Sequence, residues 1–368
     1  MISYAREGIT IDLVARALRK TALNPRVMVP ISAILHWGIT ATEVHPIQSL
    51  AYACASLGTA LAMNDWLNTW SANNWDGGGR SAWDWVKEIV VVTGGSSGIG
   101  AGIAQELLAR NPRTTIVIVD YAPMAWTPDP GASVSYYKCD LSDAAAIRAL
   151  AARIRADVGH PTVLVNNAGL CRGASVMEGS YGDVGLTVRT NLIAPFLLAK
   201  EVLSHMARTN HGHIVIVGSV SSLFPPANVA DYSATKAGIT AFHEVCVARR
   251  RGDHSSSPLA FVEVYLQWLD KTNSRKALQL ELKHVHHAPR VRLTLGILGF
   301  INTPLFKGET RQSHFLFPLL HTDTAAETVV DALYSGLGRT FYLPGIMRYA
   351  AMLVSRRGGT PESVFRMC

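Results

Sequence analysis

Short apolar runs rich in valine and isoleucine alternate with longer amphipathic segments from residue 87 to the C-terminus. The runs span residues 89–93, 115–120, 134–138, 163–166, 214–218 and 291–295. Between them, apolar residues recur at helical spacing, as Ile99, Ile103 and Leu107 do. Strands that are apolar on both faces are typical of a parallel sheet with crossover helices on either side. The pattern therefore predicts an α/β fold over residues 87–368, with a doubly wound, Rossmann-like parallel sheet.

Residues 1–86 follow a different pattern, which predicts a helical extension. Basic residues precede an apolar run over residues 27–42, and a second run over residues 44–64 contains no Lys, Arg, Asp or Glu. The basic residues are Arg16, Arg19, Lys20 and Arg26, and the tryptophans that follow the second run are Trp66, Trp70, Trp75, Trp83 and Trp85. This arrangement is typical of a membrane interface. We expect residues 1–86 to associate with a membrane, as a hairpin or as one short span.

Two alternatives remain for the apolar segments outside the predicted sheet. The N-terminal region can instead be a soluble helical extension that packs on the second domain. The apolar stretch over residues 341–354 is expected either to pack on that domain or to enter the same membrane interface.

Composition narrows the class of protein. The net charge of +7 is not gathered into a basic face with interleaved aromatic residues, so nucleic-acid binding is not expected. The five cysteines are scattered without redox or metal-ligand spacing, which favours a reduced, intracellular environment. The histidines at 284, 286 and 287 have no cysteine or carboxylate at ligand spacing, so no metal site is expected. Together, the scattered cysteines and the apolar N-terminal region indicate an intracellular protein at a membrane such as the endoplasmic reticulum or a lipid-droplet surface.

A glycine-rich segment follows the first predicted strand and opens the first predicted helix. It reads Thr93-Gly94-Gly95-Ser96-Ser97-Gly98-Ile99-Gly100. Glycines permit positive φ values and let a pyrophosphate approach the backbone, and a helix N-terminus offers free N–H groups to it. The segment therefore predicts a dinucleotide site. Its expected contacts are Thr93, Gly94, Ser96, Ser97, Gly98, Ile99 and Gly100.

Asp120 ends the second predicted strand, 20 residues after Gly100. A carboxylate at this point can bind the adenosine ribose hydroxyls and would repel a 2′-phosphate. No Lys or Arg stands at Tyr121 or at Ser96 and Ser97. NAD(H) is therefore favoured, with NADP(H) as the alternative; taken alone, Asp120 would be a plain turn residue.

Three later segments complete a recognisable set. Asn166-Asn167-Ala168-Gly169 closes the fourth strand, Ser219 follows the fifth, and Tyr232-Ser233-Ala234-Thr235-Lys236 comes 13 residues later. With the glycine segment, these motifs resemble the short-chain dehydrogenase/reductase family over residues 87 to about 305. The N-terminal apolar region adds a resemblance to the membrane-bound steroid and retinol dehydrogenase branch.

The resemblance implies four catalytic residues, Ser219, Tyr232, Lys236 and Asn191. Tyr232 and Lys236 share one helix face, and the ammonium with a positive nicotinamide is expected to lower the phenol pKa. Ser219 would bind the substrate oxygen, and Asn191 would bind a water for proton relay. The implied cofactor contacts are Asp140 and Leu141 at the adenine, Asn167, Ala168 and Gly169 in the cleft, Tyr232 and Lys236 at the nicotinamide ribose, and Thr303 at the carboxamide.

Two features depart from the family pattern. The pair after the sixth strand is Leu298-Gly299, where the family usually has Pro-Gly.

The helix after Tyr232 is interrupted by residues 245–276, and joining Glu244 to Ala277 would place Ile239, Phe242, Leu278 and Leu282 on one face. Val245-Cys246, Thr272-Asn273 and Lys276 can be encoded by GTATGT, ACTAAC and AAG, which read as the signals of a small intron. We interpret residues 245–276 as a translated retained intron or an error in the gene prediction, with a real surface insertion as the alternative.

The expected function is hydride transfer between NAD(H) and an alcohol or carbonyl group of a lipophilic substrate, with a role in lipid metabolism. An NADP(H)-dependent carbonyl reductase of the same fold is one alternative. The other is a non-catalytic protein that binds a cofactor at a membrane surface. A homodimer is also expected, because the family often uses the interrupted helix for dimerisation.

Overall fold

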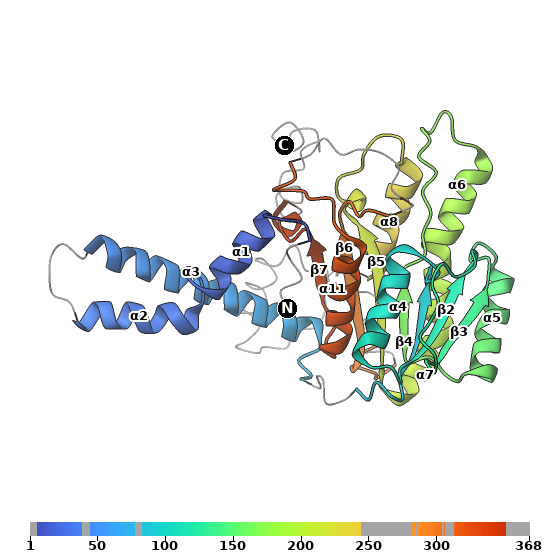
Figure 1. The fold of residues 1–368 in the computed structure, drawn as a ribbon, viewed down its shortest axis with the longest axis horizontal. Coiled ribbons are helices and arrows are strands. Elements are labelled where there is room, and N and C mark those ends of the chain that lie inside the picture. The colour runs from blue at the N-terminus through green and yellow to red at the C-terminus, as the bar shows by residue number, and fades with distance from the viewer. Residues whose placement is uncertain are drawn as a thin grey trace, which may run out of the picture.

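The structure, a computed structural model, describes residues 6–38, 45–77, 83–243, 282–283, 286–303, 305 and 313–350. Within them, a seven-stranded parallel sheet has the order β3-β2-β1-β4-β5-β6-β7 (Figure 1). The strands are β1 (Ile89–Thr93), β2 (Thr115–Asp120), β3 (Val134–Lys138), β4 (Val163–Asn166), β5 (Gly212–Ser219), β6 (Val291–Leu298) and β7 (Thr340–Leu343). The predicted doubly wound parallel sheet is confirmed.

Helices cover both faces of the sheet, and each face has its own core. On one face lie α4 (Gly98–Arg110) and α11 (Thr322–Tyr334), which pack closely at Gly102 and Ala326. On the other lie α5 (Ala144–Asp157), α7 (Ala194–Thr209) and α8 (Ala230–His243). The helix α6 (Tyr181–Val188) runs through a π-helical turn, η4 (Arg189–Ile193), into α7. The strand order reverses between β1 and β4, so a crevice is expected at their carboxyl ends.

The strands were predicted best where β-branched residues form a continuous buried run. The first four have the predicted bounds, whereas β5 and β6 extend beyond the predicted runs. The strand β7 was not predicted; it is a short, half-buried edge strand that pairs with β6. Of the two interpretations of residues 341–354, packing on the domain is therefore correct for residues 341–343, and residues 351–354 lie outside the described part.

The N-terminal region consists of three helices, α1 (Ile11–Lys20), α2 (Pro25–Gly38) and α3 (His45–Ala72). Figure 1 shows α2 and α3 side by side, projecting from the sheet domain on the side of β7. The base of α3 is attached firmly, because the buried Asn73 side chain exchanges two hydrogen bonds with Gly338 (3.0 and 2.8 Å). Among the described residues, none of the helices combines the length and the apolar character needed to cross a membrane.

Two of the tryptophans assigned to a membrane interface belong instead to the sheet domain. Trp85 is buried in the α4–α11 core and stacks on Tyr334, with ring centroids 4.2 Å apart. Trp83 packs against the same core and lies 4.4 Å from the ring of His211. Their interpretation as membrane anchors is wrong, because their position after the apolar run does not reveal which surface they cover.

The predicted insertion at residues 245–276 lies outside the described residues. On either side of it, Ile239 of α8 and Leu282 are both buried in the same core, and Phe242 packs against that core. Joining Glu244 to Ala277 would place these three residues on one apolar face, and their side chains indeed lie in or against one core. The fourth residue of that face, Leu278, lies outside the described residues.

Candidate active site

The glycine segment forms a tight turn between β1 and α4 that only glycine can adopt. Gly94 and Gly98 have φ values of +66° and +56°. A Cβ on Gly100 would lie 2.2 Å from the carbonyl oxygen of Gly94, so the first turn of α4 and the turn before it touch through their backbones. The N-cap residue Ser97 makes no side-chain capping bond. The positive end of α4 thus remains suited to a phosphate group, and the turn fits a dinucleotide.

Thr93 and Asn167 hold this turn from below. The buried Thr93 hydroxyl accepts hydrogen bonds from the N–H groups of Asn167 and Ala168 (3.0 and 3.1 Å) and donates one to Val165 O (3.2 Å). The Asn167 amide donates to the carbonyls of Thr93 and Gly94 (3.0 and 3.2 Å). The Thr93 hydroxyl thus faces β4 and supports the turn, and a contact between Thr93 and the cofactor stays a prediction.

Asp120 also braces the turn. Its carboxylate accepts hydrogen bonds from the N–H groups of Ser96 (3.0 Å) and Ala122 (3.1 Å), and the Ser96 hydroxyl donates to Ala122 O (2.9 Å). Ser96 is buried and its hydroxyl is used within the turn, so its contact with the cofactor stays a prediction. The predicted adenine contacts lie further along this edge, where Asp140 is exposed and the Leu141 side chain belongs to the core.

Ser219 stands at the carboxyl end of β5, where the strand gives way to a short 3-10 turn. Its hydroxyl oxygen accepts hydrogen bonds from the Ser221 backbone N–H (3.2 Å) and the Ser221 hydroxyl (3.0 Å). These two bonds leave the Ser219 proton for another acceptor, such as an oxygen bound in the cavity. The sequence did not identify Ser221, although the run of serines after β5 was the available signal.

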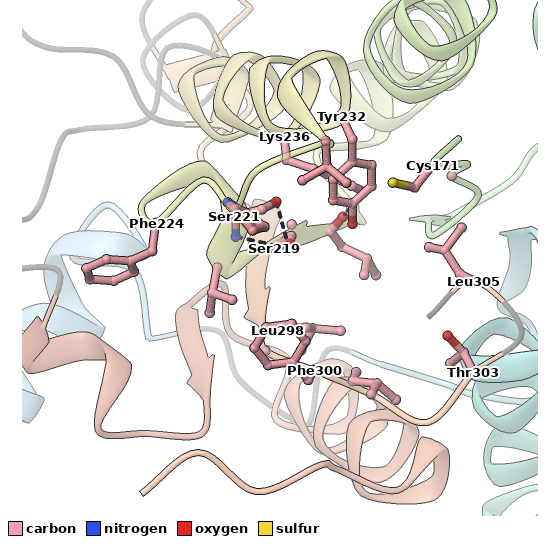
Figure 2. Close-up of a pocket in the computed structure, with 18 of the residues that line it drawn as sticks. Cys171, Ser219, Ser221, Phe224, Tyr232, Lys236, Leu298, Phe300, Thr303 and Leu305 are labelled. Carbon is pink, nitrogen blue, oxygen red and sulfur yellow. Dashed lines mark hydrogen bonds between the residues drawn. The ribbon is translucent and has the colours of Figure 1, made fainter. Parts of the chain in front are cut away.

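Tyr232 lies in the first turn of α8 and faces the same cavity as Ser219 (Figure 2). Burial raises the pKa of its phenol to about 12, although the nearby Ser219 hydroxyl opposes this rise. The expected lowering of the phenol pKa is therefore not produced by the protein alone, because desolvation of the phenolate outweighs the neighbouring polar groups. The positive nicotinamide of an oxidised cofactor is the further charge that would oppose burial.

Lys236 follows one helical turn after Tyr232 and is buried. Its ammonium donates to Val217 O (2.9 Å) and lies 5.7 Å from the centroid of the Tyr232 ring. Burial lowers its pKa to about 8. A Cβ on Gly169 would be 3.5 Å from both Lys236 Nζ and Asn191 Oδ1, so Gly169 leaves the space in which these two groups approach each other.

Asn191 lies in the π-helical turn η4, a feature that occurs often at functional sites. Its side chain accepts from Leu170 N (2.9 Å) and donates to Leu170 O (2.8 Å) and to the Thr235 hydroxyl (3.3 Å). In the structure, Asn191 thus joins the loop after β4 to α8, next to Lys236. Its assignment to a proton relay stays a prediction.

Ser219, Tyr232 and Lys236 line a cavity of about 400 Å³, whereas Asn191 stands behind its lining. Of the predicted site residues, the cavity lining includes Ile99, Asn167, Gly169, Ser219, Tyr232, Lys236 and Thr303. Much of the remaining lining is apolar and includes Phe224, Leu298 and Phe300, which are labelled in Figure 2, together with Phe317 and Met347. Cys171 also lines the cavity, and Figure 2 shows its thiol pointing toward Tyr232. Apart from the segment around Leu298, the sequence did not identify this lining, because its residues share no motif.

Comparisons with known proteins agree with this geometry. Residues 88–251 match the family model described as short chain dehydrogenase. The chain is 36% identical to Dehydrogenase RED2 of Cochliobolus heterostrophus over 183 residues, which cover 50% of this chain and 68% of that protein. It is 33% identical to 3-oxoacyl-(acyl-carrier-protein) reductase FabG of Escherichia coli (42% of this chain, 64% of that protein). It is also 33% identical to Retinol dehydrogenase 10-B of Danio rerio (43% and 54%), so it covers less than two thirds of these last two proteins.

One solved structure with a similar chain is a metagenomic short-chain oxidoreductase in complex with NADP. It is 24% identical, with a TM-score of 0.45, and the match covers 67% of this chain and 90% of that one.

Proposed function

Because this chain belongs to the short-chain dehydrogenase family, we propose that it transfers a hydride between NAD(H) and an alcohol or carbonyl group of a lipophilic substrate. The observation that carries this proposal is the meeting of Ser219, Tyr232 and Lys236 at the polar end of an otherwise apolar cavity. The bound nicotinamide ring would supply the hydride to the substrate carbon in reduction, or accept it in oxidation.

The protein moves the proton that accompanies the hydride. In reduction, the Tyr232 hydroxyl gives its proton to the substrate oxygen, and in oxidation the phenolate takes that proton back. The Ser219 hydroxyl, held by its two bonds from Ser221, donates a hydrogen bond to the same oxygen and stabilises charge that develops on it. Lys236 stabilises the phenolate and holds the ribose hydroxyls of the cofactor.

The preference for NAD(H) rests on Asp120. Its carboxylate braces the glycine turn and keeps lone pairs for ribose hydroxyls, while its negative charge opposes a 2′-phosphate. NADP(H) is the second candidate, because Lys138 is a cation close to this end of the sheet. Its Nζ lies 5.4 Å from the ring centroid of Tyr121, the residue that follows Asp120.

The partner of the N-terminal hairpin is proposed to be a phospholipid surface. Over the described residues 27–38 and 45–64, α2 and α3 contain no Lys, Arg, Asp or Glu, yet Ile34, Trp37 and Leu50 are largely exposed. At the other end of the hairpin stand Arg16, Lys20 and Arg26, whose charges suit anionic headgroups. An apolar hairpin with a basic base fits a lipid surface approached from one side.

The proposed reaction is tested by following NADH and NADPH absorbance at equal concentrations with long-chain ketones and aldehydes. We expect turnover with NADH, and a Tyr232→Phe variant should lose at least about a hundredfold in kcat while still binding NADH, because the phenyl ring cannot supply the proton. Met177→Glu, on an exposed loop outside the cavity, is the matched control and should keep wild-type activity. Undiminished turnover in Tyr232→Phe would reject the mechanism, and faster turnover with NADPH would reject the cofactor preference.

A further inference from the structure

The apolar end of the cavity is closed by two segments that belong to neither the glycine turn nor the catalytic helix. One contains Phe317 and Pro318, just before α11, and the other contains Pro344, Met347 and Ala350, just after β7. We call these two segments together the outer wall. Neither segment is a strand of the sheet, so its position depends on what holds it from behind.

The N-terminal residues hold the first segment. The buried carboxylate of Glu7 accepts hydrogen bonds from His321 N (3.0 Å) and the Thr324 hydroxyl (2.5 Å) at the start of α11. The backbone N–H of Ile11 donates to Phe315 O (2.9 Å). Each bond ends within a few residues of Phe317, so the beginning of α1 fixes this segment against the domain.

The same helix holds the second segment. The Asp12 carboxylate accepts a hydrogen bond of 2.6 Å from the backbone N–H of Gly345, which directly follows Pro344. At the other end of α1, Arg19 is paired with Asp65 of α3, and Asp65 also binds Arg348 (3.3 Å). Arg348 adjoins Met347, so the hairpin and the outer wall are connected through Asp65.

None of the three residues Glu7, Asp12 and Asp65 lines the cavity. Their effect on substrate binding would therefore come only through the position of the outer wall. We propose that Asp12 is a positioning residue for substrate binding, and that α1 thereby sets a preference for substrates with a long apolar chain. A short substrate is held at the polar end by Ser219 and Tyr232 and does not need the wall. A long chain reaches Met347 and gains affinity only while the wall is in place. The inference rests on the proposed function for its choice of substrates.

The experiment compares Asp12→Ala with Asp12→Asn, which keeps an oxygen that can accept the Gly345 N–H. The probes are butanone and a dodecanone, with kcat and KM measured using NADH and the Kd for the dodecanone measured by calorimetry. We expect Asp12→Ala to raise KM and Kd for the dodecanone by about tenfold, to leave kcat and KM for butanone unchanged, and to be rescued by Asp12→Asn. The control Asp84→Ala removes a carboxylate that accepts from Val86 N in the segment just before β1, at the amino end of the strands, and should change nothing.

Hydrogen exchange at the Gly345 amide provides a reading that does not depend on turnover; it should become faster in Asp12→Ala alone. An equal loss for both ketones, or an unchanged Kd for the dodecanone, would overturn the inference. If the wild type binds the dodecanone but reduces neither ketone, the proposed reaction is wrong, and the Kd values still decide the role of Asp12.

Discussion

Burial acts in opposite directions on the two titrating side chains of the site. It raises the pKa of the Tyr232 phenol to about 12 and lowers the pKa of the Lys236 ammonium to about 8, because both charged forms lose water. The protein by itself therefore favours the neutral phenol of Tyr232 and makes the ammonium form of Lys236 less stable. A positive nicotinamide would favour the Tyr232 phenolate that oxidation of an alcohol requires, and the phenolate would in turn favour the ammonium form of Lys236.

The lowered pKa of Lys236 predicts a stability gain with rising pH. The folded value of about 8 lies below the unfolded value of 10.5, so between these values the unfolded chain binds more protons and the free energy of unfolding rises. Lys236→Met removes this contribution. We expect the difference in unfolding free energy, wild type minus variant, to increase between pH 8 and pH 10 by about 2 kcal/mol.

Urea unfolding at pH 7, 8, 9 and 10 measures this difference. Groups elsewhere titrate in both proteins and cancel, and Tyr232, whose folded pKa is raised, lowers stability only above its unfolded value near 10. A difference that stays constant or falls over the window would show that Lys236 is not desolvated in the folded protein.

At the scale of elements, the turn between β1 and α4 is the part least able to accept a side chain. A Cβ on Gly100 would lie 2.2 Å from Gly94 O and 2.6 Å from the amide nitrogen of Asn167. Gly100→Ala should therefore displace the turn, lower stability by about 1–3 kcal/mol, and weaken NADH binding by at least about tenfold. The titration is followed by NADH fluorescence.

Gly185→Ala in α6 is the matched control for this substitution. There the added Cβ would meet only the end of the Arg189 side chain, at 3.3 Å, which can move aside. NADH affinity should stay at the wild-type value. Equal affinity in Gly100→Ala would mean that the cofactor does not depend on the backbone of this turn.

Elements were predictable where local sequence alone determines them. The strands β1 and β2 are β-branched runs that end at the glycine turn and at Asp120, and their bounds were predicted to the residue. The edge strand β7 has only four half-buried residues, so it has no clear local signal in the sequence. The π-helical turn around Asn191 also has none, because the helical spacing of apolar residues is not interrupted there.

Site residues were predictable as far as motif spacing reaches. Ser219, Tyr232 and Lys236 were expected together from spacing and resemblance, and they line one cavity. The direction of the Thr93 hydroxyl was not predictable, because a polar residue at a strand end has the same sequence pattern whether it faces a cleft or the neighbouring strand. Phe317 and Met347 were missed, since tertiary packing alone brings their loops to the cavity.

At the scale of the whole molecule, the sheet domain and the hairpin differ in how far they bury their apolar residues. The domain buries its valines and isoleucines between two helical layers, and it also buries Trp85. The hairpin instead leaves Ile34, Trp37 and Leu50 at 66%, 81% and 65% exposure. A helix that is apolar around its whole circumference is stable in water only when something covers it.

The proposed lipid surface predicts that charges on the exposed side of the hairpin prevent membrane binding without affecting the active site. Ile34→Glu and Leu50→Glu each place a carboxylate on a side chain that packs little within the protein, so the fold and NADH turnover should be unchanged.

In a lipid surface each carboxylate costs about 2–3 kcal/mol, so the partition coefficient should fall by at least about tenfold per substitution. Flotation with vesicles of phosphatidylcholine and phosphatidylserine measures this, and Met177→Glu, at an apolar side chain that is 97% exposed and lies outside the hairpin, is the control. Because Arg16, Lys20 and Arg26 stand at its base, wild-type binding should also weaken in high salt or without phosphatidylserine. Flotation that is unchanged in both hairpin variants would exclude the hairpin as the lipid-binding element, since a carboxylate buried in lipid at either position would weaken binding.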